Sequence, residues 1–257
     1  MIESERLHCV GLYFRSAALE DLKPPIHGTL QRRRCGLKLI NGVEVLTTNA
    51  ELLAPSRCAL LVIDMQNENL SGRGGYAAVG TTMVATQGAI KAISRLVRAA
   101  RSAGVLVAYA EFIHRSATGV QCNDGPNLYV HRNAEFVSEV REGTWEAKTI
   151  DELSPQPADL VFPKTRSSAF HATLLADQLH NRSIHSVVVT GMITQGCVLH
   201  THADALMHGF YPIVASDGVC TYEEEWHQLA MRWMARKSPV LEAAVIVSEW
   251  AAAGAAD

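Results

Sequence analysis

The sequence lacks a long apolar run, paired cysteines and a strong excess of charge of either sign. No apolar run approaches the ~18 residues that a membrane-spanning helix needs. No basic stretch followed by an apolar one opens the chain, so we expect neither a membrane span nor a signal peptide. The six cysteines form no C-x-x-C pair, which argues against a structural zinc site and a disulfide scaffold. These absences favour a reduced, cytoplasmic location and no membrane partner.

The charge balance argues against a nucleic-acid partner as well. The formal net charge is -3, and the cluster Arg32-Arg33-Arg34 is short and typical of a solvated loop. Of the 257 residues, 48% are hydrophobic and 19% are charged, as in a globular protein with room for one large core. The composition therefore predicts a globular protein without an electrostatic footprint for nucleic acid.

Two regions of the chain differ in pattern. Residues 1–55 mix short apolar pieces with prolines and the arginine cluster, and we expect them to form an N-terminal extension or arm. From 56 to 257, apolar runs alternate with stretches of helical spacing, which predicts one α/β domain with a parallel sheet and helices on both faces. The expected strands cover 58–63, 105–110, 160–162, 186–190, 211–215 and 243–247, and the expected helices 82–102, 171–181, 198–208 and 223–236.

Three reactive side chains follow three of the expected strands. Asp64 stands after the first strand, Lys164 after the third and Cys197 after the fourth. Because a parallel sheet binds ligands at the carboxyl ends of its strands, we expect the three groups to meet on one rim. Cys197 alone has two interpretations: a buried small cysteine, or a thiol at a helix N-terminus whose pKa the helix dipole lowers. An acid and an ammonium on the same rim favour the second.

An acid, an ammonium and a thiol are the groups that amide hydrolysis needs. Asp64 can take the thiol proton and return it to a leaving amine. Lys164 can hold the negative charges in place, and we expect it to lower the pKa of both the carboxyl and the thiol. Cys197 can attack a carbonyl carbon and form a thioester that water hydrolyses. The trio predicts an acyl-transferring hydrolase without a cofactor.

Three segments of the chain resemble the isochorismatase-like cysteine hydrolase superfamily. They are residues 59–67, Lys164 with Ser168-Ala169-Phe170, and residues 190–198, and the similarity spans roughly residues 56–250. The resemblance implies a three-layer, Rossmann-like α/β/α fold with a six-stranded parallel sheet. It also implies that Asp64, Lys164 and Cys197 form a catalytic triad.

The resemblance further implies how a substrate is held. A cis peptide bond is expected between Met192 and Ile193, and the backbone N–H groups of Ile193 and Cys197 are expected to form an oxyanion hole. Arg166 or Arg115 could pair with a substrate carboxylate. We expect four side chains to bind substrate: Asn67, Phe170, Gln195 and Tyr222.

The sequence of the turn that contains Cys197 indicates a subgroup of this superfamily. Thr194-Gln195-Gly196-Cys197-Val198 resembles amidases that act on N-carbamoylsarcosine, maleamate, ureidoacrylate or biuret. We therefore expect ammonia release from a small carboxamide or ureido compound. One alternative is a metal-assisted, nicotinamidase-like amidase in which Glu111 and His114 share a metal, although we expect no metal because no further ligand is evident. The other alternative is a non-catalytic binding protein on the same fold.

Other features favour packing and assembly. His200 and His202, two apart on a helix, point away from each other and cannot chelate together, and we expect His227 to be a surface or packing residue. Trp226 and Trp233, seven apart, share one helix face that is more often core or subunit interface than substrate platform. With the extension, this face predicts a homo-oligomer, a dimer or a tetramer. The polar section 114–143 is long enough to predict a functional role.

Overall fold

The computed structural model describes residues 38–41, 43–74, 86–114 and 140–254. The expectations for residues 1–37, for Arg115 and for most of the section 114–143 therefore lie outside the described residues. The described ranges belong to one compact unit, Lys38–Asp257. Within those ranges, no helix has both the length and the apolar character needed to cross a membrane.

A six-stranded sheet runs through the compact unit, and all of its neighbouring strands are parallel. Apolar runs form these strands, and all six residues of the strand Cys58–Ile63 are buried, as expected where helices cover both faces. The first five expected strands and the parallel sheet are confirmed. In sheet order, the strands are β5 (Leu160–Lys164), β4 (Leu106–Phe112), β3 (Cys58–Ile63), β6 (Ser186–Met192), β7 (Tyr211–Cys220) and β8 (Val240–Leu241).

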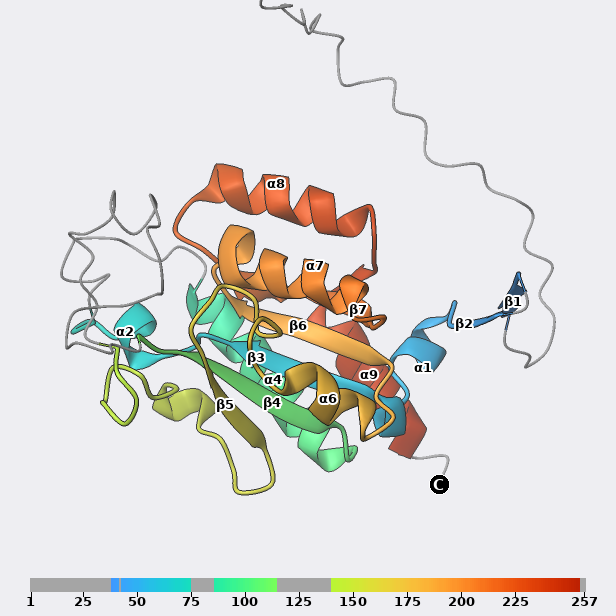
Figure 1. The fold of residues 1–257 in the computed structure, drawn as a ribbon, viewed down its shortest axis with the longest axis horizontal. Coiled ribbons are helices and arrows are strands. Elements are labelled where there is room, and N and C mark those ends of the chain that lie inside the picture. The colour runs from blue at the N-terminus through green and yellow to red at the C-terminus, as the bar shows by residue number, and fades with distance from the viewer. Residues whose placement is uncertain (1–37, 42, 75–85, 115–139, 255–257) are drawn as a thin grey trace, which may run out of the picture. The chain divides into compact units, whose positions relative to one another are not determined.

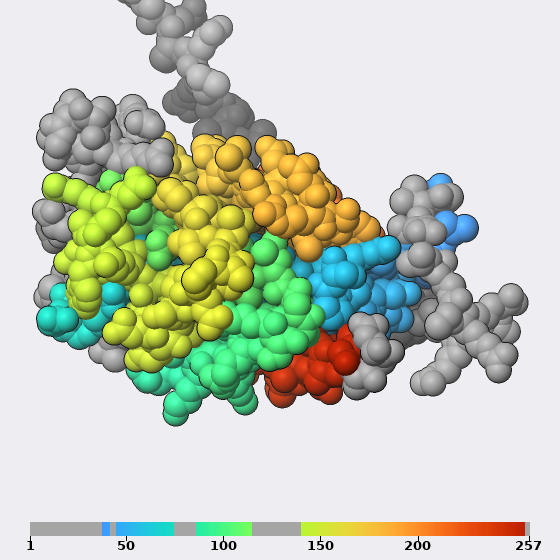
Figure 2. Space-filling view, turned by 90° about the horizontal axis from the view of Figure 1, so that it is seen from below, coloured from blue at the N-terminus to red at the C-terminus, as the bar shows by residue number. Residues whose placement is uncertain are grey.

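Helices cover both faces of the sheet, which gives the expected three-layer α/β/α architecture (Figure 1). Alternate residues of β3 enter the two halves of the core, so that Leu60 packs on one side and Leu61 on the other. Figure 2 shows α4 and α9 as neighbours on the surface of their layer. One layer holds α1 (Asn49–Leu52), α4 (Thr86–Ser102) and α9 (Ala243–Gly254), and the other holds α6 (Leu175–His180), α7 (Leu199–Met207) and α8 (Glu224–Ala235).

The last part of the expected extension, residues 38–55, belongs to the compact unit. α1 begins with a capping box in which Thr48 Oγ1 accepts from the Glu51 N–H (3.2 Å) and the Glu51 carboxylate accepts from the Thr48 N–H (2.9 Å). Leu52 and Leu53 are buried in the core, so the compact unit begins ahead of the boundary expected at residue 56. Other described elements are β1 (Lys38–Ile40), β2 (Val43–Val45), α2 (Asn67–Leu70) and helical turns at Pro55–Arg57, Asp151–Leu153 and Thr194–Val198.

The strand expected over 243–247 is wrong, because these residues begin α9. The β-branched run Val245-Ile246-Val247 suggests a strand, but the alanines on both sides favour a helix. Ala243, Ile246 and Trp250 repeat at helical spacing, and all three are buried. The sheet ends instead with the two-residue strand β8, just ahead of this helix.

A glycine allows β3 and β6 to approach each other at their carboxyl ends. Gly191 pairs with Ile63 in the parallel register and has a φ of 113°, in the region that favours glycine. A Cβ atom at this position would lie 2.1 Å from the Ile63 carbonyl oxygen. Since Asp64 follows β3 and Cys197 follows β6, this close approach sets the separation of two candidate site residues.

Gly191→Ala should therefore destabilise the fold. We expect the free energy of unfolding in urea to fall by at least about 3 kcal/mol, because backbone must shift to admit the methyl group. The control is Gly88→Ala, at an exposed position of α4 where nothing lies within 4 Å of an added Cβ. This variant should gain about 0.5–1 kcal/mol, and equal effects at the two glycines would contradict the role given to Gly191.

Candidate active site

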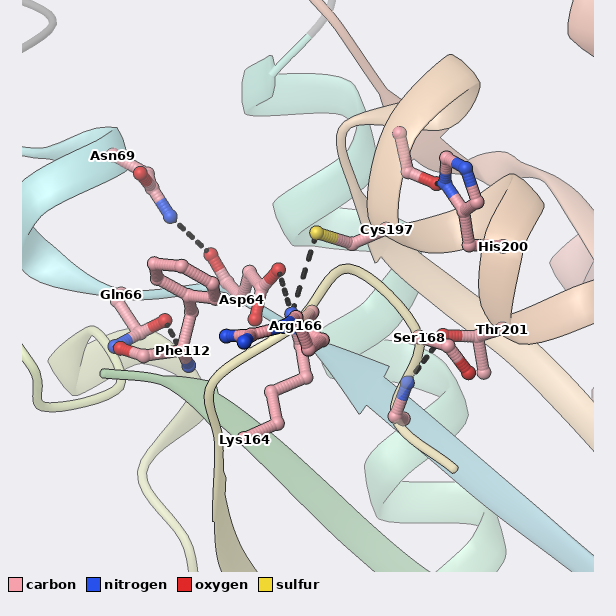
Figure 3. A network of polar contacts seen from close by, with 12 residues as sticks. Asp64, Gln66, Asn69, Phe112, Lys164, Arg166, Ser168, Cys197, His200 and Thr201 are labelled. Carbon is pink, nitrogen blue, oxygen red and sulfur yellow. Dashed lines mark hydrogen bonds and ion pairs between the residues drawn. The ribbon is translucent and has the colours of Figure 1, made fainter. Parts of the chain in front are cut away.

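The carboxyl ends of β5, β3 and β6 bring three reactive side chains together (Figure 3). Asp64 follows β3, Lys164 ends β5, and Cys197 lies in the turn Thr194–Val198 beyond β6. Lys164 Nζ lies 2.9 Å from Asp64 Oδ2 and 3.3 Å from Cys197 Sγ. The expectation that these groups meet on one rim of the sheet is confirmed.

The Lys164 ammonium is the centre of the cluster. Its side chain is 0% exposed, and its third contact is the Arg166 carbonyl oxygen at 3.0 Å from Nζ. An ammonium has three N–H donors, and here each has an acceptor. Nζ also lies 4.8 Å from the centre of the Phe112 ring. This set of partners offsets the cost of burying the charge.

Asp64 is held by its backbone as well as by its carboxyl group. Its φ of 53° is in the left-handed region, which Asp tolerates better than most residues. The Asp64 N–H donates to the Ala110 carbonyl oxygen (3.0 Å), and the Asp64 carbonyl accepts from the Gln66 N–H and from Asn69 Nδ2 (both 2.8 Å). Oδ1 is buried and accepts no hydrogen bond from the described residues.

Cys197 lies in a tight turn directly ahead of α7. The peptide bond between Met192 and Ile193 is cis, as expected from the sequence. The Ile193 carbonyl oxygen accepts from the N–H groups of Gly196 (2.9 Å) and Val198 (3.3 Å), which closes the turn. An added Cβ at Gly196 would lie 2.8 Å from the Ile193 side chain, so the turn has little room for a larger residue. Figure 3 shows the resulting direction of the thiol, toward Lys164.

The lowered thiol pKa expected from the sequence is wrong. Burial and the nearby Asp64 raise the pKa of Cys197, Lys164 opposes this only in part, and the pKa is raised to about 12. Cys197 as a whole residue is partly exposed, yet protein atoms surround its thiol closely enough for desolvation to dominate the pKa. The Cys197 thiol is therefore neutral near pH 7.

The expectation that Lys164 lowers the pKa of Asp64 below its ordinary range is also wrong. Burial raises the pKa of Asp64, and the nearby Lys164 opposes this without reversing it. Burial would lower the pKa of Lys164, but Asp64 and Cys197 together hold it above the ordinary value. A carboxyl with a raised pKa is a better proton acceptor than an ordinary Asp, as a general base requires.

Gln66 is a site residue whose role the sequence did not reveal. Its Nε2 donates to the carbonyl oxygens of Phe112 (2.9 Å) and Ala147 (2.7 Å), and its Oε1 accepts from the Phe112 N–H (2.8 Å). These bonds join Gln66, two residues after Asp64, to the end of β4. Gln66 lies within the segment 59–67, which carries the resemblance to the superfamily, so the sequence did mark its position. The sequence could not show whether its side-chain amide binds substrate or holds the backbone in place.

His227 also contacts the nucleophile turn. His227 is partly buried, which fits the expected surface or packing residue. It also makes a polar contact that we did not expect, because its Nδ1 lies 2.9 Å from Thr194 Oγ1. Thr194 is fully buried and follows Ile193. The contact links α8 to the turn that carries Cys197. Sequence spacing could not indicate it, because the two residues are 33 positions apart.

The four expected substrate-binding side chains have different surroundings. Asn67 Nδ2 donates to the Trp145 carbonyl oxygen at 2.9 Å. Phe170 is buried and stacks on His208 and Phe210, beyond the end of α7, so its ring takes part in core packing. Gln195 Oε1 is buried without a partner among the described residues. Tyr222 follows β7 and is partly buried.

The residues considered for a metal have other contacts. Glu111 Oε1 accepts from the N–H (3.1 Å) and Oγ1 (2.8 Å) of Thr149. His200 Nδ1 contacts the Gly196 carbonyl oxygen at 2.7 Å, whereas His202 Nε2 contacts Ser238 Oγ. In the part of the chain that the structure describes, no three His, Cys, Asp or Glu residues are grouped as metal ligands.

A groove of about 890 Å³ lies between α4 and the end of β7. Thr221 and His227 line it, but none of the trio Asp64, Lys164 and Cys197 does. The reactive groups and their hydrogen bonds lie at the trio, outside the lining of this groove.

Comparisons with known proteins match most of the compact unit. A family model described as the isochorismatase domain matches residues 58–247. The ureidoacrylate amidohydrolase RutB of an Enterobacter species is 32% identical over 186 residues, which cover 69% of this chain and 81% of that protein. The protein of the same name from Variovorax paradoxus is 34% identical over 185 residues, which cover 68% of this chain and 73% of that protein.

Solved structures share the fold. A cysteine hydrolase from Pseudomonas syringae pv. phaseolicola has a TM-score of 0.67 and 23% identity, and the match covers 77% of this chain and 94% of that one. N-carbamoylsarcosine amidase from Thermoplasma acidophilum has a TM-score of 0.59 and 24% identity, with coverage of 73% and 96%. At these identities the likeness shows the three-layer fold alone.

The raised thiol pKa predicts the reactivity of Cys197. At pH 8, wild-type Cys197 should react slowly with iodoacetamide, because a thiol whose pKa is about 12 is rarely ionised there. Asp64→Asn removes the negative charge that raises this pKa, so alkylation should become about tenfold faster. Mass spectrometry of the peptide that contains Cys197 gives both rates.

The control is Glu111→Gln, which removes a carboxylate that hydrogen-bonds Thr149 rather than Lys164. This variant should leave the alkylation rate of Cys197 unchanged. Alkylation of Asp64→Asn at or below the wild-type rate would contradict the electrostatic account of the site.

Proposed function

We propose that this chain, which belongs to the isochorismatase family, releases ammonia from a small ureido compound or carboxamide through a thioester on Cys197. The observation that carries the proposal is the contact of the Lys164 ammonium with both Asp64 Oδ2 and Cys197 Sγ. It places an acid and a thiol beside one cation, each within hydrogen-bond reach of its ammonium, as nucleophilic catalysis requires. The similarity to two ureidoacrylate amidohydrolases favours a ureido substrate over the nicotinamidase-like alternative, and an enzyme over a non-catalytic binding protein.

The first step forms a bond between sulfur and carbon. Cys197 Sγ attacks the carbonyl carbon of the substrate while its proton passes to Asp64, so no free thiolate has to form in the resting site. The carbonyl oxygen becomes an oxyanion, and we assign its stabilisation to the backbone N–H groups of Ile193 and Cys197. Lys164 stays protonated and holds the sulfur and the carboxyl group in place.

The second step breaks the C–N bond. Asp64 returns the proton to the departing nitrogen, and ammonia leaves an acyl group on Cys197. Asp64 then takes a proton from a water molecule that attacks the same carbon, and the C–S bond breaks to give an acid and a free thiol. If the substrate is a ureide, the acyl group is a thiocarbamate and the acid is a carbamate, which loses carbon dioxide to give an amine.

Two buried acceptors suit a substrate rich in N–H groups. Asp64 Oδ1 and Gln195 Oε1 are without partners among the described residues, and buried acceptors of this kind gain from a ligand that brings donors. A terminal carbamoyl group supplies two N–H donors. Arg166, beside Lys164 in Figure 3, is the side chain we assign to a substrate carboxylate such as that of ureidoacrylate.

A substrate panel tests the proposal. We expect the protein to release ammonia from one or more of ureidoacrylate, maleamate, biuret and N-carbamoylsarcosine, with little release from nicotinamide. Cys197→Ala should lower kcat/KM at least about 1000-fold, because no other group supplies the nucleophile. Cys58→Ala, at the buried start of β3, should keep most of the activity.

Two outcomes would contradict this mechanism. Full activity of a folded Cys197→Ala variant would exclude a thiol nucleophile. Loss of wild-type activity on treatment with a chelator, regained with added metal, would favour the metal-assisted alternative.

The raised pKa of Asp64 predicts the acid side of the pH profile. The base must be ionised to accept the thiol proton, so kcat/KM should fall as the pH is lowered through the pKa of Asp64. Because burial raises that pKa, the midpoint should lie above 3.8, the ordinary value. Circular dichroism at each pH separates this loss from unfolding, and a midpoint at or below 3.8 in folded protein would contradict the assignment of Asp64 as the base.

A further inference from the structure

The outer face of α8 exposes three large apolar side chains. Trp226, Leu229 and Trp233 are 54%, 43% and 40% exposed. Their spacing of three and four residues places them along one stripe of the helix. Only Ala230 and Met234 of this twelve-residue helix are classed as buried. The helix therefore presents more large apolar side chains to solvent than it buries.

Trp233 contacts α7, because its ring centre lies 5.7 Å from that of His202, but all three side chains of the stripe stay exposed to solvent. Figure 1 shows α8 as the outermost helix of its layer, with α7 between it and the sheet. Single exposed apolar residues are ordinary, but three neighbours along one helix form a contiguous patch of the kind that marks an interface. Tryptophan is also among the residues enriched at the centres of protein interfaces.

Charges at the two ends of α8 indicate which partner fits the stripe. Glu223, Glu224 and Glu225 lie at its start, and Arg232, Arg236 and Lys237 lie at its end, all of them exposed. A second α8 packed antiparallel places each acidic end against a basic end. A parallel arrangement would bring like charges together, which disfavours association. The charge pattern is thus complementary to itself.

We propose that a second copy of this chain covers the stripe, with the two α8 helices antiparallel across a two-fold axis near Leu229. The two-fold axis makes Leu229 face its own counterpart, as in an isologous interface. Glu225 and Arg232, seven apart, lie on one flank of the stripe. In the antiparallel pair, Glu225 of one copy lies beside the partner's Arg232, and the same pair occurs twice.

The helix dipole offers a second reason for this distribution of charge, because acids stabilise a helix start and bases a helix end. The two explanations differ in one respect. Glu225 and Arg232 are two turns apart and cannot contact each other within one helix. Exchanging the charges of Glu225 and Arg232 makes their interaction with the helix dipole less favourable, whether or not the chain dimerises. In the antiparallel pair, however, the exchanged residues again place opposite charges side by side across the interface.

Sedimentation velocity over a range of protein concentrations tests the interface. The wild-type protein should be a dimer or a larger even assembly at micromolar concentration. Leu229→Glu puts two carboxylates next to each other at the axis, and we expect the dissociation constant to rise at least about 100-fold. Leu174→Glu is the control, because Leu174 is 68% exposed and lies outside α8. The assembly formed by this variant should have the same mass as that of the wild type.

Charge exchange tests the orientation of the helices. Glu225→Arg and Arg232→Glu should each weaken the assembly, and the double variant should regain association to within about fivefold of the wild type. Circular dichroism confirms that each variant is folded. Three results would each overturn the proposal. They are a wild-type protein that is monomeric, a Leu229→Glu variant that assembles like the wild type, and a double variant that associates no more tightly than the single variants.

Discussion

The buried ammonium of Lys164 is the interaction on which the rest of the site depends. An isolated ammonium in a protein interior costs several kcal/mol, so its burial requires partners in fixed places. The chain provides them from three separate segments: the Asp64 carboxylate after β3, the Cys197 sulfur after β6 and the Arg166 carbonyl oxygen after β5. The site therefore forms as the protein folds, because the Lys164 ammonium is stable in the interior only when all three segments are in place.

The strand order explains why a long cationic side chain occupies this position. β5 is an edge strand, and β4 separates it from β3, so a residue at its end must reach across the neighbouring strand to meet Asp64. The four-carbon stem of Lys164 does so beside the Phe112 ring at the end of β4. Gln66 fixes the end of β4, and Gly191 lets β6 approach β3. A shorter cation, or a side chain at Gly191, would separate the partners.

Sequence patterns predicted the elements that depend on local rules. The apolar run before Asp64 and the positions of Lys164 and Cys197 at strand ends followed from the geometry of parallel sheets, and the resemblance correctly implied the cis bond before Ile193. Patterns failed where the answer depends on distant contacts. The run Val245-Ile246-Val247 is helical because Ala243, Ile246 and Trp250 share one helix face, which packs into the core beside the sheet. The thiol pKa is raised because burial and Asp64 together outweigh Lys164. The contact of His227 with Thr194 joins segments that no periodicity relates.

In the proposed mechanism the Cys197 thiol is neutral at rest, and it loses its proton to Asp64 only as the sulfur attacks the substrate. The central claim is that this attack leaves an acyl group on Cys197, and rapid acid quenching during turnover of ureidoacrylate or another hydrolysed ureide, followed by mass spectrometry, tests it most directly. The account predicts a mass increase on the peptide containing Cys197 equal to the substrate less one ammonia, and no such increase in Cys197→Ser. Turnover with that peptide unmodified at every quench time, and with Cys197→Ser releasing ammonia at the wild-type rate, would contradict it.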